Sequence, residues 1–327
     1  MNALKRLSRD VRVRHSISWS ILVLVLLGMV LGIGRATEKI DYIWQWQRMP
    51  RYLYFHKQID ITATDPGTVS AIRDDGKDRV VVLRTFDGKD ETYRVPAGEV
   101  EVYEGDNLDS GDVIGSYKKW VPGILLIGLW LTLKMSFISV ILAVFIGLIT
   151  GLARISSSPA PKWLAIGYIE LIRGTPLLVQ IYIFYFFIGQ LFSLSNEVAG
   201  ILALSFFAGA YVAEIVRAGI QSIHRGQMEA ARSLGMTYPQ AMQFIILPQA
   251  LKRIMPPLAG QFISLIKDSS LVSIIAITDL TKAGREIATS TFNPFEAFFT
   301  VAALYLMLTF SLSMFVQYLE RRYATID

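Results

Sequence analysis

The chain has 327 residues, of which 53% are hydrophobic and only 18% are charged, a balance outside the usual range for soluble globular proteins. It contains no cysteine, which excludes disulfides and thiolate chemistry, and its three scattered histidines argue against a metal centre. The net charge of +5 lies in short segments beside apolar runs, which is typical of a protein embedded in lipid rather than one that binds nucleic acid.

Residues 1–33 combine a basic cytoplasmic tail with one apolar run. The run covers Ile17–Ile33, is longer than the core of a usual signal peptide, and has no small-residue cleavage site after it. We therefore expect an uncleaved anchor span with the N-terminus in the cytoplasm, and a cleaved signal peptide is the alternative. The cations of the tail are Lys5, Arg6, Arg9, Arg12 and Arg14.

Residues 34–119 are soluble in character, with 16 acidic and 13 basic side chains. Within them, Arg79–Phe86 and Glu91–Val95 are β-prone runs separated by the turn-forming residues 87–90. This pattern predicts a β-hairpin. We expect a small β-rich extracytoplasmic domain here, inserted between the first and second spans.

Residues 120–327 carry five further apolar runs, each about 20 residues long and so able to cross the hydrocarbon core. With the N-terminus inside, the connections rich in arginine and lysine fall on the cytoplasmic side, as does the C-terminus. The fold class predicted is an all-α polytopic membrane protein with five spans beyond the anchor. The runs lie near 122–151, 173–192, 197–219, 256–277 and 296–318.

A long cytoplasmic connection, residues 220–253, separates the runs at 197–219 and 256–277. Its pattern predicts two short helices, Met228–Leu234 and Pro239–Ile246, with Pro248 ending the second. The alternative is a solvated loop that lies on the membrane surface.

The defined positions of this connection resemble the EAA loop of ABC importer permeases. The resemblance implies a coupling helix that docks on a separate ATP-binding subunit, which binds the ATP and magnesium. This chain has no Gly-rich phosphate loop of its own, so we expect it to be no enzyme and to hold no cofactor. The matching residues are Glu229, Ala230, Ala231, Gly235, Ile245, Leu247 and Pro248.

Two further segments, Glu170–Gln180 and Ala213–Ile220, are similar to the permeases that import polar amino acids such as histidine, glutamine and arginine. The similarity covers about residues 121–322. It implies a type I importer fold in the bacterial inner membrane, a second permease (identical or homologous), an outer solute-binding protein and an amino acid substrate. The alternatives are a membrane-anchored sensor or scaffold and an ion-coupled carrier.

Ionisable residues at membrane depth are costly and therefore functional candidates. If the span at 256–277 begins near Pro256, Lys267 lies about 16 Å along the helix, close to mid-bilayer. Lys267 and the adjacent Asp268 could line the translocation path or form a structural pair between helices. Three serines would line the same path, namely Ser264, Ser269 and Ser270.

Two pairs with a spacing of three residues point to structure near the cytoplasmic side. Glu214 and Arg217 are expected to form a local ion pair on one helix face. Glu170 and Arg173 share this spacing just before a span. The residues that follow, Gly174, Thr175 and Pro176, are expected to bend the chain into an elbow beside the gate.

Overall fold

The protein is described by a computed structural model that covers residues 19, 21–25, 27–28, 31–32, 34–35, 37–96 and 98–324. The chain divides into two units, Met1–Trp46 and Gln47–Asp327. In the first unit, the described residues between Trp19 and Glu38 are helical. The predicted basic tail lies outside the described residues, and the predicted anchor run lies only partly within them.

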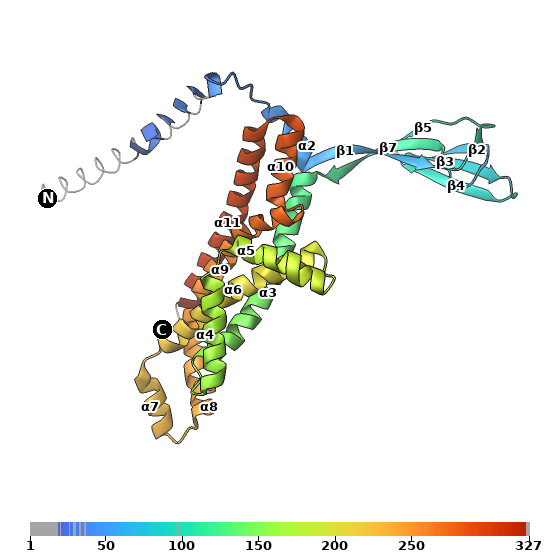
Figure 1. The fold of residues 1–327 in the computed structure, drawn as a ribbon. Helices are drawn as coiled ribbons and strands as arrows, with labels where there is room; N and C mark the ends of the chain where they lie inside the picture. The colour runs from blue at the N-terminus through green and yellow to red at the C-terminus, as the bar shows by residue number, and fades with distance from the viewer. Residues whose placement is uncertain are drawn as a thin grey trace, which may run out of the picture. The chain divides into compact units, whose positions relative to one another are not determined.

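The strands of the described chain all lie between Tyr54 and Pro122 (Figure 1). They form two antiparallel sheets with the strand orders β1-β7-β5 and β4-β3-β2-β6. A 3-10 turn, η1 (Trp46–Arg48), and a one-turn helix, α2 (Pro50–Leu53), precede them. The strands are β1 (Tyr54–Thr62), β2 (Gly67–Asp75), β3 (Asp78–Thr85), β4 (Asp90–Pro96), β5 (Glu99–Val100), β6 (Asn107–Leu108) and β7 (Val113–Pro122).

The predicted hairpin is confirmed by β3 and β4, which pair antiparallel with Val81 opposite Tyr93. Its turn contains Gly88 with φ +80°, a left-handed conformation that glycine adopts without steric cost. Alternate residues of the strands point inward, so Val81 and Leu83 are completely buried. Their neighbours in this small core include Val69, Val102 and Ile114.

The helices occupy the rest of the second unit (Figure 1). Several deviate from α geometry over a few residues, as the π-helices η2 and η3 and the 3-10 helix η4 show. In chain order they are α3 (Ile124–Arg154), α4 (Pro159–Arg173), α5 (Leu177–Tyr182), η2 (Ile183–Gly189), α6 (Asn196–Gln221), α7 (Arg225–Ser233), α8 (Tyr238–Ala241), η3 (Met242–Ile246), α9 (Leu247–Asp268), η4 (Ser269–Ile275), α10 (Leu280–Thr291) and α11 (Pro294–Ala324).

Within the described chain, four continuous helical stretches are long and apolar enough to cross a membrane. A fifth candidate is the pair formed by α4 and α5–η2, which is bent by 105°. This pair begins at Pro159, well before the start of the predicted run at 173. The four continuous stretches are Ile124–Arg154, Asn196–Gln221, Tyr238–Ile275 and Pro294–Tyr318.

The prediction that Pro248 ends a helix is wrong, because α8, η3 and α9 run on without a break. Pro248 lacks the backbone N–H that an α-helix needs. The π-turn η3 directly precedes it, and there the Leu247 backbone N–H bonds to the carbonyl of Met242, five residues back. This shift in the hydrogen-bonding register, together with the place of Pro248 in the first turn of α9, lets the helix continue.

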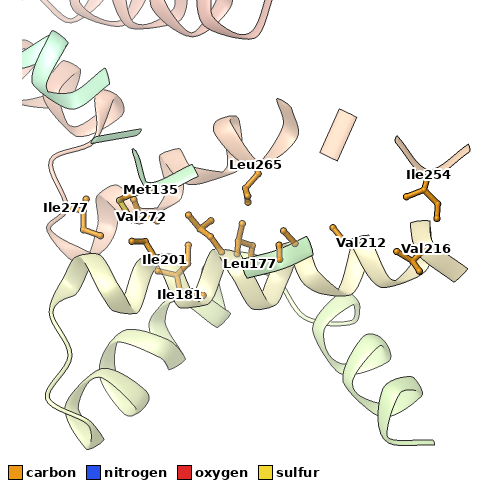
Figure 2. Close-up of a cluster of buried hydrophobic side chains, with 14 of the residues drawn as sticks. Met135, Leu177, Ile181, Ile201, Val212, Val216, Ile254, Leu265, Val272 and Ile277 are labelled. Carbon is orange, nitrogen blue, oxygen red and sulfur yellow. The ribbon is translucent and has the colours of Figure 1, made fainter. Parts of the chain in front are cut away.

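The helix α6 lies at the centre of the largest apolar core (Figure 2). Side chains from α5 and α9, such as Ile181 and Leu265, converge on it, and both are completely buried. The helix α3 also packs closely, since a Cβ added at Gly147 would lie 2.4 Å from a methyl carbon of Val212. Small residues at such contacts let membrane helices approach at backbone distance.

The strands and the turns between them, residues 54–122, form a β-domain. This domain joins the helices at the point where its two chain ends lie together. The first and last strands pair with Tyr54 opposite Pro122. The Gly123 backbone N–H donates to the carbonyl of Leu53 at 2.6 Å. A Cβ at Gly123 would lie 2.2 Å from the carbonyl oxygen of Tyr52, so only glycine permits this approach.

Candidate functional site

The connection between α6 and α9 is a helical loop whose two ends are held together. Arg253 Nη1 donates to the carbonyl oxygen of Ser222 at 2.5 Å and to its Oγ at 3.1 Å. One turn further into the loop, Gln249 Nε2 donates to Gln227 Oε1 at 3.3 Å. Because these bonds join α6 and α7 to α9, the base of the loop is fixed to both flanking helices.

The first helix of the loop, α7, has one buried and one exposed face. Ala231 is buried, whereas Glu229 and Ala230 are exposed. His224 caps the N-terminus of this helix, and its Nδ1 accepts a hydrogen bond from the backbone N–H of Gly226 at 3.1 Å. The exposed carboxylate and small side chain therefore face away from the rest of the described chain.

Gly235 ends α7 as the sequence predicts, in a turn with φ +84°. Its backbone N–H donates to the carbonyl of Arg232 at 3.0 Å, and nothing lies within 4 Å of a Cβ added there. The backbone conformation, rather than space, requires glycine at this position. The next helix starts with a capping box, in which the Thr237 N–H donates to Gln240 Oε1 at 2.8 Å.

The remaining residues of the predicted motif lie where the loop returns toward the membrane. Ile245 and Leu247 are partly buried against the apolar core. Pro248 is exposed. The motif therefore divides into an exposed part on α7, a turn at Gly235, and an anchoring part on η3 and α9.

Three arginines converge on Glu214 near the end of α6. Arg154 Nη1 lies 2.5 Å from Glu214 Oε1, while Arg217 Nη2 and Arg173 Nη1 lie 2.9 and 3.9 Å from Oε2. The predicted pair of Glu214 and Arg217 is confirmed. Glu170 lies 3.9 Å from Arg154. In the described chain, Glu170 and Arg173 therefore contact other members of this network, which joins α3, α4 and α6, rather than each other. Arg154, the last residue of α3, is the member that sequence spacing did not reveal.

The chain bends between α4 and α5, where the sequence predicts an elbow at Gly174, Thr175 and Pro176. A buried amide that we did not single out holds this bend. Gln180 Nε2 donates to the carbonyl of Ile172 at 2.7 Å and to Thr175 Oγ1 at 2.8 Å. These bonds satisfy backbone groups that the break leaves without helical partners.

Lys267 lines a cavity of about 320 Å³ between α9, η4, α10 and α11. Of the predicted path residues, Ser270 lines the same cavity, together with Thr281 and Tyr305. Ser269 is completely buried, and its Oγ donates to the carbonyl of Ile266 at 2.7 Å.

Two other predicted path residues, Ser264 and Asp268, are partly buried and do not line this cavity. The depth of Lys267 also differs from the expectation, because its helix begins before Pro256. Lys267 is the twenty-first residue of α9, which begins at Leu247. It therefore lies roughly 30 Å from the start of α9 at 1.5 Å per residue.

A short helix that the sequence analysis missed, α10, covers this cavity from the loop after η4. Asp279 caps its N-terminus, accepting from the backbone N–H groups of Thr281 and Lys282 at 3.0 and 2.9 Å. The Leu280 N–H donates to Thr132 Oγ1 of α3 at 3.1 Å. Burial raises the pKa of the Asp279 carboxyl, while these backbone hydrogen bonds act in the opposite direction. The signal available in the sequence was the cap residue Asp279 itself.

The amino-acid sequence matches the family described as "binding-protein-dependent transport system inner membrane component" over residues 143–325. This match covers the elements that build the loop, the Glu214 network and the Lys267 cavity. It begins beyond the β-domain.

Curated relatives named as permeases also match a part of this chain. The probable glutamine ABC transporter permease protein GlnM of Bacillus subtilis is 42% identical over 196 residues, which are 60% of this chain and 91% of the relative. The glutamine transport system permease protein GlnP of Escherichia coli K12 is 37% identical over 61% of this chain and 92% of its own length. The arginine transport system permease protein ArtQ of Bacillus subtilis is 36% identical over 62% and 94%.

Solved structures of ABC transporters are similar to a part of this chain as well. A crystal structure of an amino acid ABC transporter with histidines shares 43% identity and a TM-score of 0.58, over 61% of this chain and 94% of that chain. The methionine ABC transporter MetNI in an inward-facing conformation shares 22% identity and a TM-score of 0.54, over 61% and 95%, which shows the fold alone. In each comparison more than a third of this chain has no counterpart.

Proposed function

Because the chain belongs to the family of binding-protein-dependent transport system inner membrane components, we propose that it carries a polar amino acid across the bacterial inner membrane. It is the transmembrane permease subunit of an ABC importer, in which the ATPase is a separate subunit. Relatives named for glutamine and arginine support the substrate class. They favour this role over a sensor, a scaffold or an ion-coupled carrier.

The observation that carries the coupling mechanism is the exposed face of α7 on a loop with a fixed base. Glu229 and Ala230 offer a carboxylate and a small surface to the ATP-binding subunit, which would hold the ATP and magnesium. Gly235 makes the sharp end of the docking helix. Because Arg253 bonds to Ser222, movement of α7 would be passed to α6 and α9 together.

The translocation path would run past Lys267 and Ser270, whose cavity is lined by hydroxyl groups on one part and by the apolar residues Phe298, Val301 and Ala302 on the other. A lysine ammonium beside hydroxyls suits the carboxylate of an amino acid. We also assign to this path Ser264, Ser269 and Asp268. The Glu214 network and the elbow at residues 174–176 would hold the cytoplasmic ends of three helices and set how far the path opens.

The remaining assembly is also part of the proposal. A second permease, identical or homologous, would complete the membrane core, and an extracytoplasmic solute-binding protein would deliver the amino acid. Both termini would be cytoplasmic, with residues 1–33 forming an anchor and residues 34–119 lying outside. The concentration of acidic residues in that segment and of cations beside the spans supports this orientation.

The test is whether the purified chain retains an ATP-binding subunit and whether the exposed part of the loop carries that contact. Glu229→Lys and Gly235→Pro are expected to abolish co-purification and ATP-dependent uptake, since one reverses the docking charge and the other removes the left-handed turn. Glu286→Lys, a charge reversal on α10, is the matched control and should still bind the ATPase. Retention of the ATPase and uptake by both loop variants would refute the docking role.

A further inference from the structure

The root of the β-domain, defined as residues 48–57 and 118–122, carries an unbalanced positive charge. It holds five cations and no acidic residue. The rest of the domain, residues 60–116, holds 14 acidic and 6 basic residues. Charge is therefore segregated along the domain, with a basic root beside the helices and an acidic remainder. The five cations are Arg48, Arg51, Lys57, Lys118 and Lys119.

Two of these cations face each other directly, since Lys57 is opposite Lys119 in the β1–β7 ladder. Like charges in this arrangement destabilise a sheet. In the described chain, no root cation has a carboxylate within 4.0 Å. In the remainder of the domain, by contrast, Arg84 and Arg94 each form an ion pair with an aspartate. The root therefore offers unpaired positive charge to an anionic partner outside the domain.

Aromatic side chains surround these lysines. Tyr54, Phe55 and Trp120 are 54%, 40% and 61% exposed, although rings of this size usually lie buried in a small domain. Trp120 packs against His56 with ring centroids 3.8 Å apart. Exposed tyrosine and tryptophan next to lysine are typical of the membrane–water interface, where the rings sit at headgroup level.

The root lies directly beside the first membrane helix of its unit. Pro122 is followed by Gly123, the residue that caps α3. Within the first two turns of α3, Ile127 and Trp130 are 52% and 68% exposed. Lipid would cover these apolar side chains, so the bilayer reaches to within a few residues of the root. Electrostatic attraction to a charged bilayer extends over about 8–10 Å, and the long lysine side chains can reach toward the surface.

We infer that the root of the β-domain binds the phosphate headgroups of anionic phospholipids in the leaflet that faces the domain. The lipid phosphates supply the negative charge that the root lysines lack within the domain, and the aromatic rings enter the headgroup layer. Repulsion between the lipid and the acidic residues 60–116 holds the remainder of the domain off the surface. The inference rests on the proposed extracytoplasmic position of the domain. Each lysine is expected to strengthen the contact about fivefold.

The absence of native cysteine permits a direct measurement on the full chain. A fluorescent label is placed at Gln58→Cys, the residue that directly follows the root and lies opposite Lys118, or at Ser110→Cys in the acidic part. The first of these is called the root label. Each protein is reconstituted in nanodiscs that contain a nitroxide headgroup quencher in either phosphatidylglycerol or phosphatidylcholine. We expect strong quenching of the root label with phosphatidylglycerol, less with phosphatidylcholine or at high salt, and little quenching of the Ser110 label.

The variant that carries K57Q, K118Q and K119Q should reduce root quenching in phosphatidylglycerol to the phosphatidylcholine level. The matched control, R73Q with K77Q and K89Q, removes three exposed cations from the acidic part and should leave root quenching unchanged. Equal quenching in both lipids, or no effect of the root variant, overturns the inference. If the root variant instead loses only affinity for the solute-binding protein, the root is a protein contact and the lipid site is refuted. The assay needs neither ATPase nor uptake, so its failure is distinguishable from failure of the proposed function.

Discussion

Asp279 shows how a single side chain can hold an element that hydrophobic periodicity does not reveal. Its carboxylate is completely buried and caps α10. Replacement by alanine is expected to lower the free energy of unfolding by about 1–2 kcal/mol, because two backbone N–H groups lose their acceptor. Thermal unfolding of the detergent-solubilised protein measures the loss.

The Asp279→Asn variant separates the cap from the charge. It keeps one acceptor, so its stability should lie between those of the wild type and Asp279→Ala. Because burial holds the pKa of the native carboxyl above its unfolded value, the unfolded state releases the proton first as pH rises. The wild type therefore loses stability relative to the asparagine variant as pH rises through this interval. A difference that grows with rising pH would contradict the assignment.

The polar residues of the site differ in how well sequence alone predicts them. The spacing of Glu214 and Arg217 on one helix predicted their ion pair, because residues three apart face the same side. Glu214 on α6 also contacts Arg154 on α3. These helices are far apart in the sequence, so the spacing of residues along one helix does not indicate this contact. Sequence thus predicted the local pair and missed the residue that makes it a network.

At the scale of elements, the bend between α4 and α5 depends on Gln180. We expect Gln180→Leu to destabilise the protein by about 1–3 kcal/mol, because the carbonyls of Ile172 and Thr175 lose their donor in a buried place. Gln190→Leu, an exposed glutamine at the end of the same span, is the matched control and should have little effect. Thermal unfolding gives the stability. The distance between spin labels on α4 and η2 reports whether the bend opens.

Sequence reasoning was more successful with turns than with helix ends. The glycines at 88 and 235 predicted turns because only glycine adopts their backbone conformation cheaply. Pro248 misled the prediction, since a π-turn let the helix pass through it. The helix α4 was missed because its charged residues, among them Lys162 and Arg173, indicated a connection between spans.

At the scale of the whole molecule, the β-domain is expected to be removable. Deletion of residues 54–122, with a short glycine linker from Leu53 to Gly123, joins two points already connected by a hydrogen bond. The helical part should fold and retain the ATPase, because a relative named as a permease aligns with only 64% of this chain over 99% of its own length. We expect the deletion to weaken uptake or affinity for the solute-binding protein.

Uptake of labelled amino acids in proteoliposomes and binding of the solute-binding protein measure this outcome. Unchanged uptake and affinity in the deletion would show that the domain does not contribute to delivery.

The position of the β-domain in the chain could be predicted from composition, because the excess of acidic residues changes sharply at its borders. The packing of the root of this domain could not be predicted from composition. The contact of α2 with α3 depends on backbone approach at Gly123 and on the burial of Met49 beside Leu125 and Leu280. Such contacts between distant segments are set by tertiary structure, on which local patterns carry little information.

The continuous helix from Tyr238 to Ile275 connects the loop between α6 and α9 with the cavity beside Lys267. A rod of 38 residues is roughly 57 Å long at 1.5 Å per residue. Pro256 and Pro257 lie near its middle, where each removes a backbone hydrogen bond and makes bending easier. The helix can therefore bend at the two prolines, so that its part in the loop can move while its part beside Lys267 keeps its direction.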